Sequence, residues 1–172
     1  VAAFASLKLK NEVTIVSISD KTSELICESI LMKIKCKKYS LYLMGIYRSP
    51  QSNLENSIDV ILTQLDKIHD PNNPIVIMGD INVDSLTVNN ENQILSEALE
   101  GYNIKRLELP ATRITHHSRT SIDFICTNLN EEQVACNVTI TGLSDHTAQV
   151  CRIMAEKEKT TTNVTMRRIV NE

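Results

Sequence analysis

The stretch PIVIMGDINVD, residues 74–84, decides how this chain folds. The unbroken apolar run Ile75–Met78 is typical of a strand that is buried on both faces of a sheet. Gly79 is expected to let the backbone turn sharply where this run ends. A spacing of two places side chains on one face of an extended chain, so Asp80 and Asn82 are expected to project together from the carboxyl end of the strand. Such a pair could orient a water molecule and hydrogen-bond a phosphate, or it could be a structural turn with side-chain caps.

Strand and helix patterns are mixed on both sides of this stretch. Before it, the apolar periodicity predicts strands over Glu12–Ile18, Leu25–Cys36 and Tyr39–Tyr47 and a helix over Asn53–His69. After it, the pattern predicts a helix over Glu91–Glu100 and strands over Ile122–Thr127, Gln133–Ile140 and Ala148–Met154. The second and third strands are expected to pair as neighbours. This mixture predicts an α/β or α+β domain with sheets in the middle and helices outside.

Local signals refine the ends of the two helices. Ser52 and Glu55 form the S-x-x-E pattern of a capping box, which predicts the start of the first helix. Gly101 is expected at the C′ position of the second helix.

The bulk composition bounds the class of protein. The chain has 172 residues, 42% of them hydrophobic, which suits one domain with a mostly aliphatic core. We expect that domain over residues 1–154, followed by a polar linker or tail over residues 155–172. No apolar run approaches the ~20 residues that span a bilayer, so no membrane partner is expected, and no signal peptide is visible.

Cysteine content and charge give weaker indications. The five cysteines contain no CxxC pair, which argues against a disulfide framework and a zinc site and favours buried thiols in a reducing, intracellular compartment. The net charge of −3 gives no global indication of nucleic-acid binding. Residues 51–100 hold nine acids and one lysine, whereas residues 103–123 are locally basic. That basic segment is either a phosphate-facing edge or a solvated loop.

Four polar clusters lie at predicted strand ends. In chain order they are Tyr-Arg-x-Pro over residues 47–50, Gly-Asp-x-Asn over 79–82, Ser-x-Asp over 121–123 and Ser-Asp-His over 144–146. Each alone is compatible with a core residue, a turn or a strand-initial carboxylate. Their order and spacing together resemble the endonuclease/exonuclease/phosphatase superfamily, in particular the endonuclease domain of non-LTR retrotransposons. The segment Pro110–Arg113, which precedes the Ser-x-Asp cluster, adds to this resemblance, which extends over residues 1 to about 154.

The resemblance implies a fold and a reaction. The fold would be a deoxyribonuclease I-like, four-layer sandwich of two β-sheets flanked by helices, with catalytic residues on loops at one edge. The reaction would be metal-dependent hydrolysis of a phosphodiester, which requires a positioned nucleophile and positive charge on the phosphate oxygens.

Residue roles carry over from the resemblance. Asp80 would orient or deprotonate the attacking water, and Asn82 would hold that water or a phosphate oxygen. His146 would stabilise charge on the phosphate, while Asp123 pairs with His146 and fixes its tautomer. Tyr47 would hydrogen-bond the phosphate.

The remaining site residues concern metal and substrate. Asp145 would hold Mg²⁺ or help to place the phosphate. The side chains expected to bind substrate or phosphate are Thr112, Arg113, Arg119 and Ser121.

The first half of the family pattern is absent before Tyr47, including the glutamate that would be the main Mg²⁺ ligand. We therefore expect a fold that is incomplete at its N-terminus, lacking on the order of 70–100 residues, and a chain that is inactive and poorly stable by itself. The parent activity would nick DNA, with a reverse transcriptase domain in the same polyprotein, and would be nuclear if it acts on chromosomal DNA. The alternatives are a phosphatase of the same superfamily and a non-catalytic binding module that retains the fold.

Overall fold

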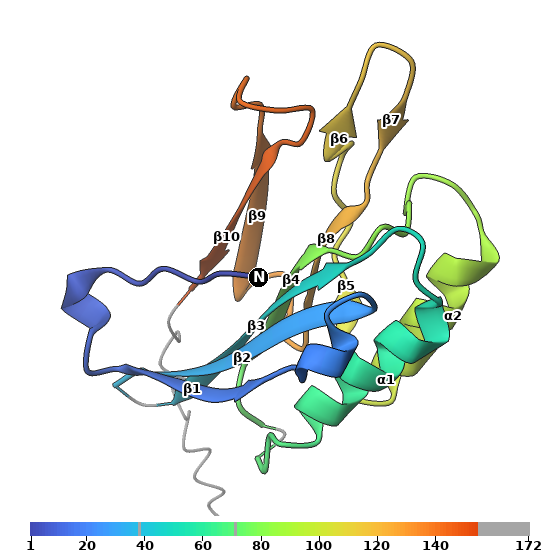
Figure 1. Cartoon of the computed structure of the whole chain (residues 1–172). Helices are drawn as coiled ribbons and strands as arrows, with labels where there is room; N and C mark the ends of the chain where they lie inside the picture. The colour runs from blue at the N-terminus through green and yellow to red at the C-terminus, as the bar shows by residue number, and fades with distance from the viewer. Residues whose placement is uncertain (38, 71, 155–172) are drawn as a thin grey trace, which may run out of the picture.

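A computed structural model describes residues 1–37, 39–70 and 72–154. The predicted tail over residues 155–172 lies outside the described residues. The sequence folds into the predicted mixed α/β arrangement, with one large sheet, two short β-ribbons and two α-helices (Figure 1).

The large sheet has six strands. In order across the sheet they are β1 (Val13–Ile18), β2 (Cys27–Lys35), β3 (Ser40–Arg48), β4 (Ile75–Asp80), β8 (Asp123–Thr127) and β5 (Lys105–Arg106). The pair β3–β4 is parallel and the other neighbouring pairs are antiparallel. The strands β2 and β3 are adjacent, as predicted.

The other elements lie around this sheet. The helices are α1 (Leu54–Leu65) and α2 (Asn90–Glu100), and short 3₁₀ turns cover Leu7–Leu9 and Lys21–Ser23. The two β-ribbons pair β9 (Val134–Thr139) with β10 (Ala148–Ile153), and β6 (Arg113–Ile114) with β7 (Arg119–Thr120).

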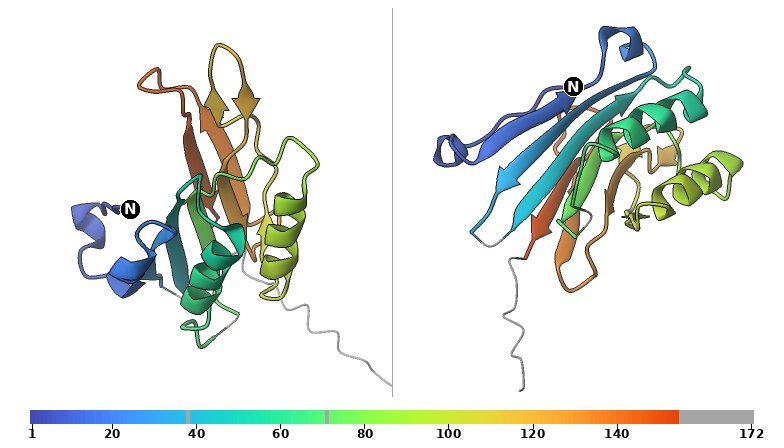
Figure 2. Two further views of the ribbon diagram at one scale, coloured as in Figure 1. Left: turned by 45° about the vertical axis from the view of Figure 1, so that its right-hand side comes forward. Right: turned by 90° about the horizontal axis from the view of Figure 1, so that it is seen from below.

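Two apolar cores lie on the two faces of the large sheet. On one face, α1 and α2 pack over a core that includes Met44, Ile77 and Phe124. On the other face, the ribbon β9–β10 packs over a smaller core that includes Val76 and Ile125 (Figure 2). Because successive strand residues point to opposite faces, Val76 and Ile77 of one strand serve different cores, as the unbroken apolar run predicts. The described residues thus show helices, large sheet and second sheet as successive layers.

Helix ends differ in detail from the expected capping. The cap of α1 is Asn53, whose side chain accepts the N–H of Asn56, whereas the Ser52 hydroxyl donates to the Ser49 carbonyl. The predicted capping box is therefore wrong by one residue, and α1 ends at Leu65 rather than His69.

The C-terminal end of α2 also differs from the expected capping by glycine. Gly101 has φ −57°, which is right-handed, and the residue with positive φ is Asn103 at 57°. Asn is the residue that most readily replaces glycine in this left-handed region.

Gly79 is required for a reason other than the expected turn. It lies inside β4 with φ 142°, and a Cβ there would lie 1.9 Å from the Ile46 carbonyl oxygen on β3. The close approach of two parallel strands therefore demands glycine, and the strand continues through Asp80.

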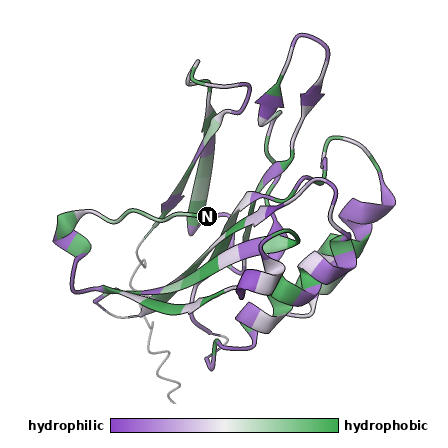
Figure 3. Ribbon diagram, viewed as in Figure 1, coloured by the Kyte–Doolittle hydropathy of each residue, from purple (hydrophilic) through white to green (hydrophobic). Residues whose placement is uncertain are grey.

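The ribbon β9–β10 leaves the outer end of the large sheet uncovered. Ile15 and Ile18 on β1 are 57% and 58% exposed, although they lie opposite Met32 and Ile30 on β2. The hairpin β6–β7, by contrast, is hydrophilic and extends away from both cores (Figure 3).

Among the described residues, no helix is long and apolar enough to cross a membrane.

Candidate active site

Three adjacent strands bring Tyr47, Asp80 and Asp123 into one row. Tyr47 on β3 is in register with Asp80 on β4, and Asp80 is in register with Asp123 on β8. Residues in direct register project from the same face of a sheet, with strands about 4.8 Å apart. Three of the predicted site residues, from three separate motifs, are therefore neighbours at one end of the sheet. Tyr47 is 40% exposed and so is available to a ligand.

Asp80 and Asn82 are coupled through the backbone rather than by sharing a strand face. The Asp80 carboxylate accepts the backbone N–H of Asn82 through Oδ1 at 2.9 Å, which makes an Asx turn. Asn82 has φ 52°, and its side-chain Nδ2 donates to the Arg48 carbonyl at 2.8 Å. The expected extended spacing of the two side chains is therefore wrong, because the chain leaves the strand immediately after Asp80.

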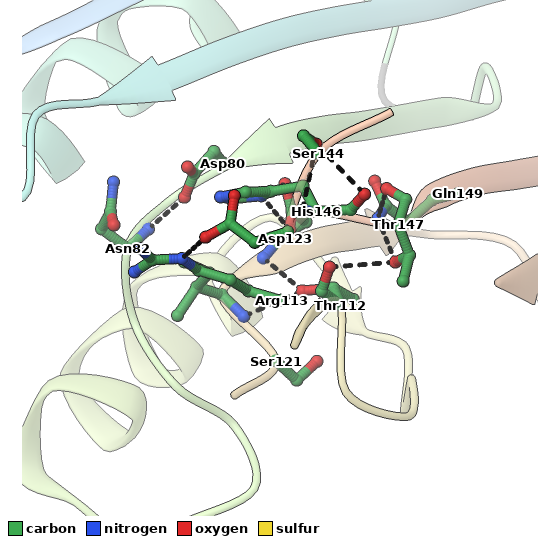
Figure 4. A network of polar contacts seen from close by, with 12 residues as sticks. Asp80, Asn82, Thr112, Arg113, Ser121, Asp123, Ser144, His146, Thr147 and Gln149 are labelled. Carbon is green, nitrogen blue, oxygen red and sulfur yellow. Dashed lines mark hydrogen bonds and ion pairs between the residues drawn. The ribbon is translucent and has the colours of Figure 1, made fainter. Parts of the chain in front are cut away.

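His146 reaches the row from the loop between β9 and β10 (Figure 4). Its Nδ1 lies 3.0 Å from Oδ2 of Asp123, so the predicted carboxylate–imidazole pair is present. Asp123 is 8% exposed, which keeps water from competing for this contact. Because Nδ1 faces Asp123, Nε2 is the ring atom left for a ligand. The Ser144 hydroxyl accepts the backbone N–H of His146 at 3.1 Å and so helps to orient it.

The electrostatics of Asp80 reflect its position between two strands. Burial, the largest cause, raises the pKa of the Asp80 carboxyl. The Asn82 N–H lowers this pKa, the nearby Asp123 carboxylate raises it, and His146 and Arg113 lower it. A carboxylate held in this way accepts a proton more readily than a solvated one, which suits a group that handles a water molecule.

Asp80, Asp123 and His146 also form a group that could hold a metal ion. One ligand atom from each lies within 4.8 Å of the others, and this is the one such group among the described residues. Carboxylate oxygens suit Mg²⁺, whereas an imidazole suits the later transition metals. With the His146 Nδ1 committed to Asp123, the chemistry of the donor set fits a hard cation held through Asp80 and Asp123 oxygens, completed by water or substrate.

Asp145, the predicted metal ligand, has a different partner in this structure. Its Oδ2 accepts from Nε of Arg113 at 2.7 Å, and both side chains are more than 40% exposed. The Arg113 guanidinium lowers the pKa of the Asp145 carboxyl, and Asp145 in turn raises the pKa of Arg113. Asp145 lies outside the metal-capable group, so its expected metal role has no geometric support here.

Thr112 is fully buried and organises the backbone of the site. Its hydroxyl accepts the N–H groups of Ile122 and Asp123 at 3.1 and 3.0 Å. Its carbonyl accepts the N–H of Thr147 at 2.7 Å. Thr112 therefore joins the strand that carries Asp123 to the loop that carries His146. We expected Thr112 to contact the phosphate directly. A side chain with 0% exposure cannot make that contact.

The two other predicted phosphate ligands lie apart from the row. Ser121 is 1% exposed, and its hydroxyl is buried without a hydrogen-bond partner, so it too is inaccessible to a substrate. Arg119 is exposed on β7, in the hairpin that projects beyond the site. Of the four predicted substrate-binding side chains, only Arg113 and Arg119 are accessible from solvent.

Two arginines, one buried and one partly buried, support the site, and we did not assign either of them. Arg48, 3% exposed, donates to the carbonyls of Ile81 and Ser52 at 3.2 and 2.6 Å. Arg106 donates to the carbonyls of Val83 and Ser121 at 3.1 and 2.8 Å. Arg48 belongs to the Tyr-Arg-x-Pro cluster, which was a usable signal, whereas nothing distinguishes Arg106 from other basic residues of its segment.

This chain is similar to known proteins in sequence pattern and in fold. The family described as Endonuclease-reverse transcriptase matches residues 41–150. No curated protein matches this chain in sequence at a significant level.

Three solved structures are similar to this chain in fold. The endonuclease domain of TRAS1, a telomere-specific non-LTR retrotransposon, is 17% identical with a TM-score of 0.62, over 73% of this chain and 61% of that one. D. rerio TDP2, in complex with a single-strand DNA product, is 14% identical with a TM-score of 0.57, over 83% and 68%. The human Nocturnin catalytic domain is 16% identical with a TM-score of 0.54, over 83% and 59%.

These likenesses establish the fold as that of the endonuclease/exonuclease/phosphatase proteins, and this chain spans about 61% of the TRAS1 domain. Because the family match covers residues 41–150, which include every cluster of the site, the chain belongs to the endonuclease–reverse transcriptase family.

Proposed function

We propose that this chain carries the catalytic centre of a metal-dependent phosphodiesterase that nicks DNA. The observation that carries the proposal is the row of Tyr47, Asp80 and Asp123 across adjacent strands, with His146 paired to Asp123. The row combines a proton acceptor, an oriented imidazole and a phenol at one accessible edge. Phosphodiester hydrolysis needs an activated nucleophile and donors to the phosphate oxygens, and these groups can supply both.

Each side chain has a defined task in the reaction in this proposal. Asp80 orients the attacking water and takes its proton, for which its raised pKa is suited. His146 stabilises negative charge on the phosphate through Nε2, and Asp123 fixes the tautomer that makes this possible. Tyr47 donates to a phosphate oxygen, and the side-chain oxygen of Asn82 contacts the water or the phosphate.

A bound Mg²⁺ would be held by Asp80 and Asp123 and would neutralise charge on the phosphate. Mg²⁺ sites in proteins use few carboxylates, and here Asp123 is already shared with His146. No glutamate belongs to the metal-capable group of the described residues. From the sequence we expected an inactive chain. Because the described residues retain a metal-capable group, we infer instead that this chain binds Mg²⁺ weakly and nicks DNA slowly when it acts alone.

DNA is proposed as the substrate because two accessible arginines lie in the hairpin that projects beyond the site. Arg113, which is paired with Asp145, and Arg119 belong to this hydrophilic hairpin β6–β7 (Figure 3), where a polyanion that extends past the row can contact them. The family match supports a further proposal, a reverse transcriptase in the same full-length protein. We also propose a nuclear site of action if the substrate is chromosomal DNA.

The test is nicking of supercoiled plasmid by the wild-type chain and by the Asp80→Asn and His146→Gln variants, with Mg²⁺, with Mn²⁺ and with a chelator. We expect weak metal-dependent nicking by the wild type and a fall of at least tenfold in each variant. Binding of Mn²⁺, followed by electron paramagnetic resonance, is expected to weaken in Asp80→Asn and not in His146→Gln.

The alternatives predict other results. Faster hydrolysis of a phosphate monoester than of DNA would favour a phosphatase. Equal Mn²⁺ binding by the wild type and Asp80→Asn, with DNA still bound, would contradict the catalytic proposal and favour a binding module.

A further inference from the structure

The ribbon β9–β10 places two cysteines directly opposite each other. Cys136 on β9 is the register partner of Cys151 on β10. Neither residue belongs to the catalytic row, and the five cysteines are free thiols in this structure. The pair is therefore a chemical feature that the proposed function does not use.

The hydrogen-bond pattern of the ribbon identifies the kind of pair. The Met154 N–H donates to the Gln133 carbonyl at 2.8 Å, so residues 133 and 154 form a hydrogen-bonded pair. Antiparallel pairs alternate between hydrogen-bonded and non-hydrogen-bonded types along the ribbon. Three positions further along, Cys136 and Cys151 are accordingly a non-hydrogen-bonded pair.

This type of pair suits a disulfide. Directly opposite residues without hydrogen bonds have Cα atoms about 4.5 Å apart, with their side chains close together. Disulfides bridge Cα atoms separated by about 4.4–6.8 Å. Both cysteines point to the core between the ribbon and the large sheet, so their Cβ atoms lie on the same face. The pairing register and the shared face are therefore compatible with a bond between the two sulfur atoms.

The surroundings distinguish the two thiols. Cys136 lines an open groove of about 680 Å³ beside β5, together with Lys105. Cys151 does not line that groove, and burial, followed by its neighbour Cys136, raises its pKa to about 12. Cys136 is thus the thiol that a solvent-borne reagent reaches first.

We propose that Cys136 and Cys151 are a modification site that forms a reversible cross-strand disulfide, with a low-molecular-weight disulfide such as oxidised glutathione as the oxidant. The Cys136 thiolate attacks one sulfur of the oxidant, forms a mixed disulfide and releases one small thiol. The Cys151 sulfur, after losing its proton to solvent, attacks Cys136, breaks the mixed disulfide and releases the second small thiol. The two protein thiols are oxidised by two electrons, and one oxidant disulfide is reduced to two thiols.

The disulfide would constrain the loop that carries His146. It closes about 15 residues of chain, including residues 140–147, and so restricts the ways in which this loop can open. By the loop-entropy relation, the oxidised chain is expected to melt roughly 6–12 °C above the reduced chain.

The test starts from the folded wild-type chain in a buffer of oxidised glutathione, with dithiothreitol-treated chain as the reference. We expect the free-thiol count to fall from five to three, peptide mapping to join Cys136 to Cys151, and the melting temperature to rise. Dithiothreitol is expected to reverse all three changes.

Two variants complete the test. Cys136→Ser is expected to abolish the thermal shift, and the matched control Cys36→Ser, which removes a partly buried cysteine with no cysteine opposite it, is expected to keep it. Five free thiols after oxidation of the folded chain, a lasting glutathione adduct on Cys136, or a bridge to any other cysteine would overturn the proposal. Because the mapping is done on the wild type, a variant that fails to fold leaves this result intact.

Discussion

The two halves of the candidate site are built very differently. The half that carries Asp80 and Asp123 is a buried junction, with Ile81 and Val83 at 0% and 1% exposure. The half that carries His146 is the exposed loop 140–147, in which Leu143 is 89% exposed. One half is held by side chains in the core, and the other by backbone hydrogen bonds to residues 112–114. The positions of the two carboxylates are therefore fixed by the fold, whereas the position of the imidazole depends on a few local contacts.

The largest expected effect is on the buried half. Replacing Arg106 by Met keeps an apolar stem but removes the donor to the Val83 carbonyl and one of the donors to the Ser121 carbonyl, which also accepts the Ser85 N–H. Buried polar groups that lose a charged partner cost a few kcal/mol, so we expect the free energy of unfolding to fall by about 2–4 kcal/mol. Urea unfolding followed by circular dichroism measures the change.

The matched control is Lys105→Met, at the exposed neighbouring position on the same strand. Its unfolding midpoint is expected to stay close to that of the wild type. Equal destabilisation by the two substitutions would show that Arg106 matters only through the charge of β5.

The next effect concerns the link between the two halves. Thr112→Val preserves the shape of the side chain but removes the hydroxyl that accepts two buried N–H groups. We expect a loss of about 1–3 kcal/mol in unfolding free energy. The Asp123–His146 contact is expected to loosen as well, which nuclear magnetic resonance of the His146 imidazole would detect.

Thr115→Val is the control for this effect. The Thr115 hydroxyl also accepts two backbone N–H groups, those of His117 and Ser118, but in an exposed turn where water can replace it. A loss as large as that of Thr112→Val would contradict the assignment of Thr112 as the buried link.

The sequence predicted most of the fold because apolar periodicity is a local property. The strands β2, β3, β4 and β8 are present close to their expected bounds, and the Asp123–His146 contact is present as predicted. The short strands β5, β6 and β7 were missed because two-residue strands contain no periodicity to detect. The structural roles of Thr112 and Arg106 depend on which carbonyls and amides the fold buries beside them, and the sequence does not contain that information.

A smaller effect on stability is expected at Asp80, where one substitution removes the charge of the side chain but keeps its shape. Asp80→Asn keeps an oxygen that can accept the Asn82 N–H but removes a charge that burial opposes. We expect activity to be lost while the melting temperature at pH 7 rises slightly or stays the same.

The pH dependence of this effect has a defined sign. Because the folded-state pKa of Asp80 is raised above its ordinary value of 3.8, the folded state binds this proton more tightly than the unfolded state. The corresponding stabilisation is present below pH 3.8 and is lost as the pH rises through the folded-state pKa. The melting-temperature difference between Asp80→Asn and wild type is therefore expected to shrink as the pH falls from 7 towards 4. A difference that grows over that range would reverse the argument.

The smallest effect on stability is expected in the exposed half, at the pair Arg113–Asp145. Both side chains are open to solvent, so breaking the pair by Asp145→Asn should barely move the unfolding midpoint. The contribution of Asp145 to stability changes with pH in the opposite direction to that of Asp80. Arg113 lowers the folded-state pKa of Asp145, so the contribution is present above pH 3.8 and is lost as the pH falls through that lowered value.

The same pair should matter more for substrate than for stability. Asp145 occupies the guanidinium of Arg113, so Asp145→Asn releases that cation for a phosphate. Plasmid binding by Asp145→Asn is expected to tighten at low salt, and Arg113→Gln is expected to weaken binding and to flatten its salt dependence. A double variant that binds like Arg113→Gln would show that Asp145 acts only through Arg113. If Asp145→Asn instead weakened metal binding, Asp145 would be shown to bind a cation. In this structure its contact with Arg113 prevents that.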